Sequence, residues 1–118
     1  MNKRVLSMVM VLVLVLAWPV ASSGAYQGMD GMTLMRTCQG ADKARALAAM
    51  CRNYLNGYLD ATHQFKARPG FCLGDGDREM LPTKLVFWLA RNADKQKLPA
   101  GQALELALKD LYPCKGGK

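Results

Sequence analysis

Histidine is scarce in this sequence, and its scarcity excludes most metal chemistry. His63 is the single histidine among 118 residues, and the four cysteines include no C-x-x-C pair. A structural zinc site needs four ligands, usually in closely spaced pairs, and one histidine cannot complete such a set here. The loop "RPGFCLGDGD" holds Asp75 and Asp77 but lacks the further acids and the closing glutamate of a calcium loop. We therefore expect no metal and no other cofactor.

Long apolar runs are also lacking. The longest extends from residue 5 to residue 17, which is 13 residues, whereas a membrane-spanning helix needs about 20. This run follows Lys3 and Arg4 and precedes the small residues "ASSGA", a pattern typical of a cleavable signal peptide. We expect residues 1–25 to be removed on export. The mature chain would then lie in the periplasm, without membrane association.

The mature chain, residues 26–118, is one small domain whose core alone stabilises it only weakly. An even number of cysteines in an exported chain predicts two disulfides, formed by Cys38, Cys51, Cys72 and Cys114. Four cysteines allow three connectivities, and the sequence alone does not choose among them. We favour Cys38–Cys51 and Cys72–Cys114, which would contribute roughly 3 and 4 kcal/mol in the chain-entropy model.

Disulfides also argue against an enzyme. The segment "MCRNYLNGYLDATHQF" places Cys51, Asp60 and His63 on one predicted helix, and these are the residue types of a thiol-nucleophile site. A cysteine in a disulfide has no thiolate and cannot attack a substrate. We therefore predict no catalytic residues, and we expect Asp60 and His63 to form an exposed i,i+3 pair.

No segment alternates like a β-strand, so we predict an all-α fold, a compact bundle of about four helices. The glycine-rich residues 26–32 are expected to form a flexible leader, followed by a single domain over residues 33–118. Apolar spacing predicts helices over residues 33–38, 42–64, 79–93 and 99–111.

Several positions define these helices more closely. Asp42 is the predicted N-cap of the long helix, and Pro82 favours a start of the next helix near Met80. Pro99 is expected in the first position of the last helix. Gly57 lies inside the long helix at a cost of about 1 kcal/mol relative to alanine, so we expect another helix to cross there.

Several short motifs follow one another along the chain: "LMRTCQ", "MCRNYLNGYLDA", "FCLGDG", "VFWLAR" and "KLPAGQALELALKDLYPC". Their order resembles that in the Rap/Tai family of type VI secretion immunity proteins. Cys51, Tyr54 and Gly57 match the family's C-x-x-Y-x-x-G helix, and Tyr112-Pro113-Cys114 matches its aromatic-Pro-Cys ending. The resemblance covers nearly all of residues 34–114.

This resemblance implies a small helical periplasmic protein, often a homodimer, that neutralises a secreted amidase effector cutting peptidoglycan stems. Family members block the effector's Cys–His active site largely with the turn between the last two helices. That turn lies at residues 92–98 here, and its sequence "NADKQK" departs from the "HPE" that members often carry. The implied partner-binding residues are Arg91, Asn92, Asp94, Lys95, Gln96 and Lys97.

Other functions stay open at this point. The basic tip would suit an acidic cleft, but such charges also serve simply to solubilise a helix–helix turn. A small periplasmic chaperone is the main alternative function, although few of the eight methionines belong to the helical domain. Nucleic-acid binding is not expected, because basic residues are interspersed with nine acids. Phe87 and Met80 fall off the inner stripe of their helix and suggest a dimer contact.

Overall fold

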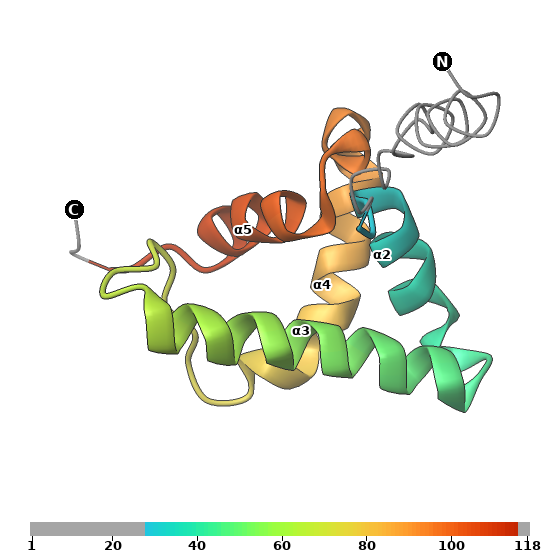
Figure 1. The fold of residues 1–118 in the computed structure, drawn as a ribbon, viewed down its shortest axis with the longest axis horizontal. Helices are drawn as coiled ribbons and strands as arrows, with labels where there is room; N and C mark the ends of the chain where they lie inside the picture. The colour runs from blue at the N-terminus through green and yellow to red at the C-terminus, as the bar shows by residue number, and fades with distance from the viewer. Residues whose placement is uncertain (1–27, 116–118) are drawn as a thin grey trace, which may run out of the picture.

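The computed structural model describes residues 28–115 and folds them into four α-helices joined by two 3₁₀ turns (Figure 1). The predicted signal peptide, residues 1–25, lies outside the described residues. The all-α prediction is confirmed, since residues 28–115 contain no strand beyond one isolated bridge. The elements in chain order are α2 (Gly31–Gln39), η1 (Gly40–Asp42), α3 (Arg45–Phe65), α4 (Asp77–Arg91), η2 (Ala93–Lys97) and α5 (Ala100–Leu111).

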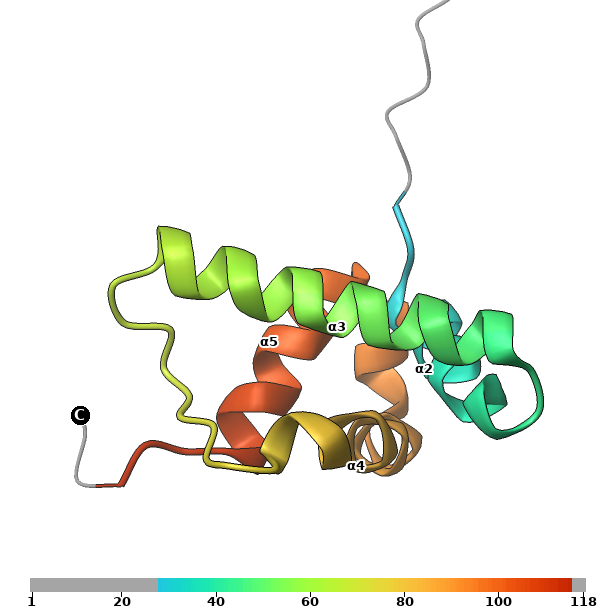
Figure 2. The same cartoon turned by 90° about the horizontal axis from the view of Figure 1, so that it is seen from below.

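The long helix α3 lies along one side of the domain, and α4 crosses it with α2 and α5 on either side (Figures 1 and 2). Each helix contributes one apolar stripe to a common core. In α4 this stripe comprises Leu81, Leu85, Trp88 and Leu89, all of them buried. The fully buried leucines are Leu34, Leu81, Leu85, Leu89, Leu104 and Leu108. Among residues 28–115, no helix is long and apolar enough to span a membrane.

Both favoured disulfides are confirmed. Cys38–Cys51 joins α2 to α3, and Cys72–Cys114 joins the loop before α4 to the C-terminal segment. All four cysteines are consumed, so none is free. The two bonds differ in environment, because Cys38 and Cys51 are only 5% and 1% exposed, whereas Cys72 is exposed.

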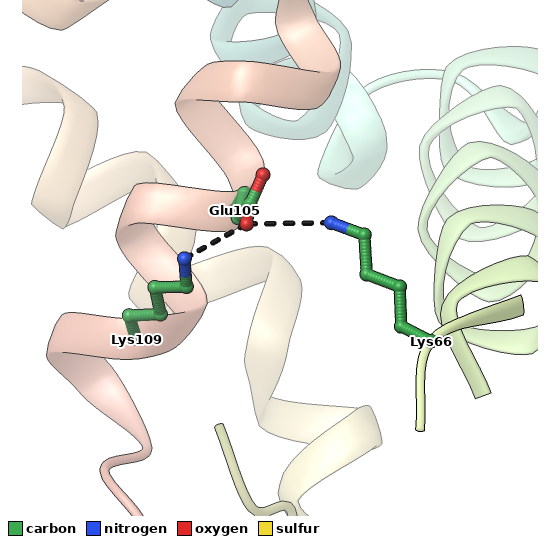
Figure 3. Close-up of polar contacts among 3 residues, drawn as sticks. All are labelled: Lys66, Glu105 and Lys109. Carbon is green, nitrogen blue, oxygen red and sulfur yellow. Dashed lines mark hydrogen bonds and ion pairs between the residues drawn. The ribbon is translucent and has the colours of Figure 1, made fainter. Parts of the chain in front are cut away.

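An ion-pair cluster ties the end of α3 to α5 (Figure 3). Glu105 Oε1 lies 2.8 Å from Lys109 Nζ on the same helix and 3.3 Å from Lys66 Nζ, the residue that follows α3. These two ammonium groups, the nearer Lys109 first, hold the pKa of Glu105 below its ordinary value. The cluster positions the C-terminal end of α3 relative to α5, where the hydrophobic contacts are fewer.

The start of α3 differs from the prediction. Asp42 is not its N-cap, because residues 40–42 form the 3₁₀ turn η1, in which the backbone N–H groups of Lys43 and Ala44 donate to Gly40 O. The N-cap is Ala44, and no side chain caps the helix. Asp42 therefore lies too early in the chain to reach the free N–H groups of the first turn of α3.

The crossing predicted at Gly57 is wrong. A Cβ built on Gly57 would have nothing within 4 Å, so this face of α3 is open. The close approach occurs instead at Gly101 of α5, where a Cβ would lie 3.7 Å from the Tyr58 ring. The large side chain belongs to α3 and the small residue to its neighbour, the reverse of the predicted arrangement.

Helix α4 begins at Asp77, three residues before the predicted start at Met80, so Pro82 lies in its second turn. Gly76 has φ +80°, and the Asp77 carboxylate accepts a hydrogen bond from Gly74 N, which together fix the start. Pro82 leaves only the carbonyl of Arg78 without its helical partner, and Arg78 is exposed to water.

Two other helices also differ at their N-terminal ends. Pro99 is the N-cap of α5 rather than its first helical residue. Helix α2 begins at Gly31, two residues before the predicted start at Thr33, because the Asp30 carboxylate accepts a hydrogen bond of 2.7 Å from Thr33 N and caps the helix. Part of the expected leader therefore belongs to the helical domain.

Candidate partner-binding turn

The turn that the sequence singled out is the 3₁₀ element η2, between α4 and α5 (Figure 1). Its polar side chains fasten it to the end of α4. Asn92 Nδ2 donates 2.8 Å to Trp88 O, and Gln96 Nε2 donates 2.9 Å to Leu89 O. Both amides thereby satisfy carbonyls at a helix C-terminus. Two of the predicted partner-binding residues, Asn92 and Gln96, therefore use their side-chain amides to hold the turn against α4.

The other end of the turn is held by the segment that precedes α2. Gly31 N donates to Leu98 O at 2.9 Å, and Ala100 N donates to Met29 O at 2.8 Å. These bonds flank an isolated antiparallel bridge between Asp30 and Pro99. Sequence reasoning missed this pairing, because the glycine-rich leader carries no strand pattern that would reveal it.

The exposed residues of the turn are mainly charged. Arg91 and Lys97 are exposed, whereas Lys95 is half-buried and pairs with Asp94 at 2.9 Å. The hydrogen bond from Lys95 lowers the pKa of Asp94 below its ordinary value. Because Asp94 and Lys95 offset each other, Arg91 and Lys97 carry the net positive charge that the turn presents to a partner.

The enzyme-like residues of α3 are not assembled for thiol catalysis. Cys51 is bonded to Cys38, and Asp60 pairs with Arg78 of α4 at 3.2 Å rather than with His63. Among residues 28–115, no three His, Cys, Asp or Glu side chains gather closely enough to hold a metal ion. Cys51, Asp60 and His63 therefore lie on one helix without forming a thiol-nucleophile site.

Two hollows lie between α3 and the beginning of α4, and the sequence did not predict them. One, of about 450 Å³, lies against the loop before α4 and is lined partly by His63, Phe71 and Asp75. The other, of about 560 Å³, is bounded by Arg52, Asn56 and Pro82. Arg78 and Glu79 line both. The loop motif "FCLGDG" lines the first hollow and was the one feature of the sequence that could have drawn attention to it.

Comparison with known proteins identifies the family. A family model described as Rap1a immunity proteins matches residues 30–114, which is nearly the whole described domain. The chain belongs to this family. No curated protein and no solved structure matches it. As a Rap1a immunity protein, the chain is of a class that binds a partner effector protein, which favours an immunity role over the chaperone alternative. The match begins at Asp30, the N-cap of α2, so the family unit includes Gly31, whose N–H pairs with Leu98 O at the end of the turn.

Proposed function

We propose that this Rap1a protein binds a peptidoglycan-cutting amidase delivered by a type VI secretion system and blocks its active site with the turn η2. The observation that carries the proposal is the double anchoring of this turn. Hydrogen bonds from Asn92 and Gln96 hold one end, and the pairing of Met29–Gly31 with Leu98–Ala100 holds the other. A preorganised loop loses little conformational entropy on binding.

Charge supports the same surface. Arg91 and Lys97 are exposed at the two ends of η2, and the only acid within the turn, Asp94, is neutralised by Lys95. A partner with an acidic rim around its active site would be attracted to this turn and oriented by it. We assign no catalytic step to the chain, since its four cysteines carry no thiolate and binding alone suffices for immunity.

The periplasm is the proposed compartment. Disulfides form and persist in oxidising compartments, and this small domain has two. The expected signal peptide over residues 1–25 would deliver the chain there. An amidase that cuts peptide stems acts in the same compartment, so inhibitor and target would meet.

A homodimer through α4 is a second part of the proposal. Met80 and Phe87 are 52% and 64% exposed, and their spacing of two helical turns places them on one face of α4. A twofold contact between two such faces would cover both apolar side chains. Phe87→Glu should shift the protein to monomer mass in sedimentation equilibrium. Phe65→Glu, a matched change at an 81% exposed phenylalanine at the end of α3, should leave the dimer intact. A wild-type monomer would exclude the contact.

The central experiment uses a secreted amidase, which the proposal expects to be encoded beside this chain's gene. Purified mature chain is added to the amidase at equal concentration, and cleavage of peptidoglycan stem peptides is followed by mass spectrometry. The proposal predicts stoichiometric loss of cleavage. Unchanged cleavage at micromolar concentrations of both proteins would contradict it.

A further inference from the structure

Gly31 is buried at the first position of α2 and lies directly against the turn η2. A Cβ on this residue would lie 2.8 Å from Lys95 O and 3.1 Å from Gln96 Cα. It would also lie 3.2 Å from the Cβ of Ala103 in α5. Contacts below 3.0 Å with a backbone atom require something to move. Gly31 is not among the glycines with positive φ, so space and not backbone conformation requires glycine here.

The carbonyl that Gly31 faces is the one that closes the turn. Leu98 N donates to Lys95 O at 3.2 Å, and Leu98 O in turn accepts from Gly31 N at 2.9 Å. Any side chain at Gly31 would push on Lys95 O from the side of α2. The turn could then keep its closing hydrogen bond only by moving away from the helix.

We propose that Gly31 is a positioning residue for the partner-binding turn, because its missing side chain lets the first turn of α2 hold Lys95–Leu98 in the conformation that binds the effector. The effect on binding rests on the proposed function, whereas the effect on the turn itself does not. Gly31 then influences partner binding through the turn, although it does not need to touch the partner.

The first test compares Gly31→Ala with Asp30→Ala by amide hydrogen exchange. Asp30→Ala removes the cap on Thr33 N and loosens the same end of α2, but it places no atom against the turn. Exchange of the Leu98 amide should be about tenfold faster in Gly31→Ala than in Asp30→Ala. Equal exchange rates in the two variants would overturn the proposal, since loosening of α2 alone would then explain the change.

A second measurement needs no variant and stays decisive if Gly31→Ala does not fold. In the wild-type chain, the Gly31 and Leu98 amides should exchange with the same opening free energy. The hydrogen bonds from Gly31 N to Leu98 O and from Leu98 N to Lys95 O should break together in one opening event. Rapid exchange at Gly31 while Leu98 stays protected would show that the turn holds its shape without α2, and would overturn the proposal.

The binding arm uses titration calorimetry with the amidase proposed as partner. Gly31→Ala should bind about tenfold more weakly than Asp30→Ala, since a displaced turn must be reordered on binding. If the wild-type chain itself does not bind, the proposed function fails while the exchange results stand. If wild type and Gly31→Ala bind equally, the positioning role fails while the proposed function stands.

Discussion

The indole Nε1 of Trp88 donates a hydrogen bond of 2.6 Å to Oδ2 of Asp110, joining α4 to the end of α5. The carbonyl of the same tryptophan accepts from Asn92 Nδ2 at 2.8 Å. Trp88 therefore links the end of α5 to the beginning of the turn. Its ring is buried in the core, whereas its partner Asp110 is exposed.

Asp110→Ala should lower the free energy of unfolding by about 1–2 kcal/mol, because it removes a part-buried hydrogen bond to a charged acceptor. Urea unfolding followed by circular dichroism measures this loss. Asp110→Asn, which keeps an acceptor oxygen, should lose less. Equal losses in the two variants would mean that charge or packing, and not the hydrogen bond, is what Asp110 contributes.

Glycine-to-alanine changes should have opposite signs at two positions. Gly57→Ala should stabilise the chain by up to about 1 kcal/mol, because the site is helical and open. Gly76→Ala should destabilise it by about 1 kcal/mol, because φ there is +80°. Thermal unfolding of both variants checks the pair. Destabilisation by Gly57→Ala would indicate that this face of α3 is covered in solution.

The two disulfides should be reduced in a fixed order. Reduction by thiol–disulfide exchange requires the thiolate of the reductant to reach a sulfur atom of the disulfide. Cys72 is exposed, whereas Cys38 and Cys51 are buried. Under native conditions with low reductant, alkylation and peptide mass mapping should label Cys72 and Cys114 first. Earlier labelling of Cys38 and Cys51 would show that α2 and α3 separate more readily than the structure implies.

Stability should fall in acid partly through Glu105. Lys109 and Lys66 lower its folded pKa, so its contribution is present above the unfolded pKa and is lost as the pH falls through the folded value. The loss should appear below about pH 4. Glu105→Gln should be less stable at neutral pH and should show a shallower loss between about pH 6 and pH 3 in urea titrations. An unchanged pH profile would show that the cluster contributes nothing to folding.

The sequence predicted the four helices because these depend on local signals, whereas the two disulfides that formed were a preference among three possible connectivities. Apolar residues at helical spacing placed Leu85 and Leu89 of α4 in the core, and Pro99 marked the beginning of α5 within one residue. Family resemblance then located the turn. Apolar periodicity and proline positions are recognisable within a few helical turns, because side-chain spacing and backbone preference determine helix formation over that length.

The failures concern contacts between distant parts of the chain. A close neighbour was expected at Gly57 and none at Gly31, which was assigned to the leader. In the structure Gly57 faces open space and Gly31 lies against the turn. The pairing of Met29–Gly31 with Leu98–Ala100 joins segments almost seventy residues apart and leaves no periodic pattern. Asp42 was a good capping residue at a position where the chain forms a 3₁₀ turn instead. Only tertiary packing decides such cases.

The most direct test of the proposed function is the affinity of two charge-reversal variants for the amidase proposed as partner, measured by titration calorimetry at fixed salt. Arg91→Glu/Lys97→Glu alters the exposed cations at η2. Lys43→Glu/Arg45→Glu makes the same net charge change at η1, which lies beyond the other end of α2. Binding through the turn predicts that the first variant loses about tenfold or more in affinity and that the second stays close to wild type. Equal affinities for both variants would contradict it.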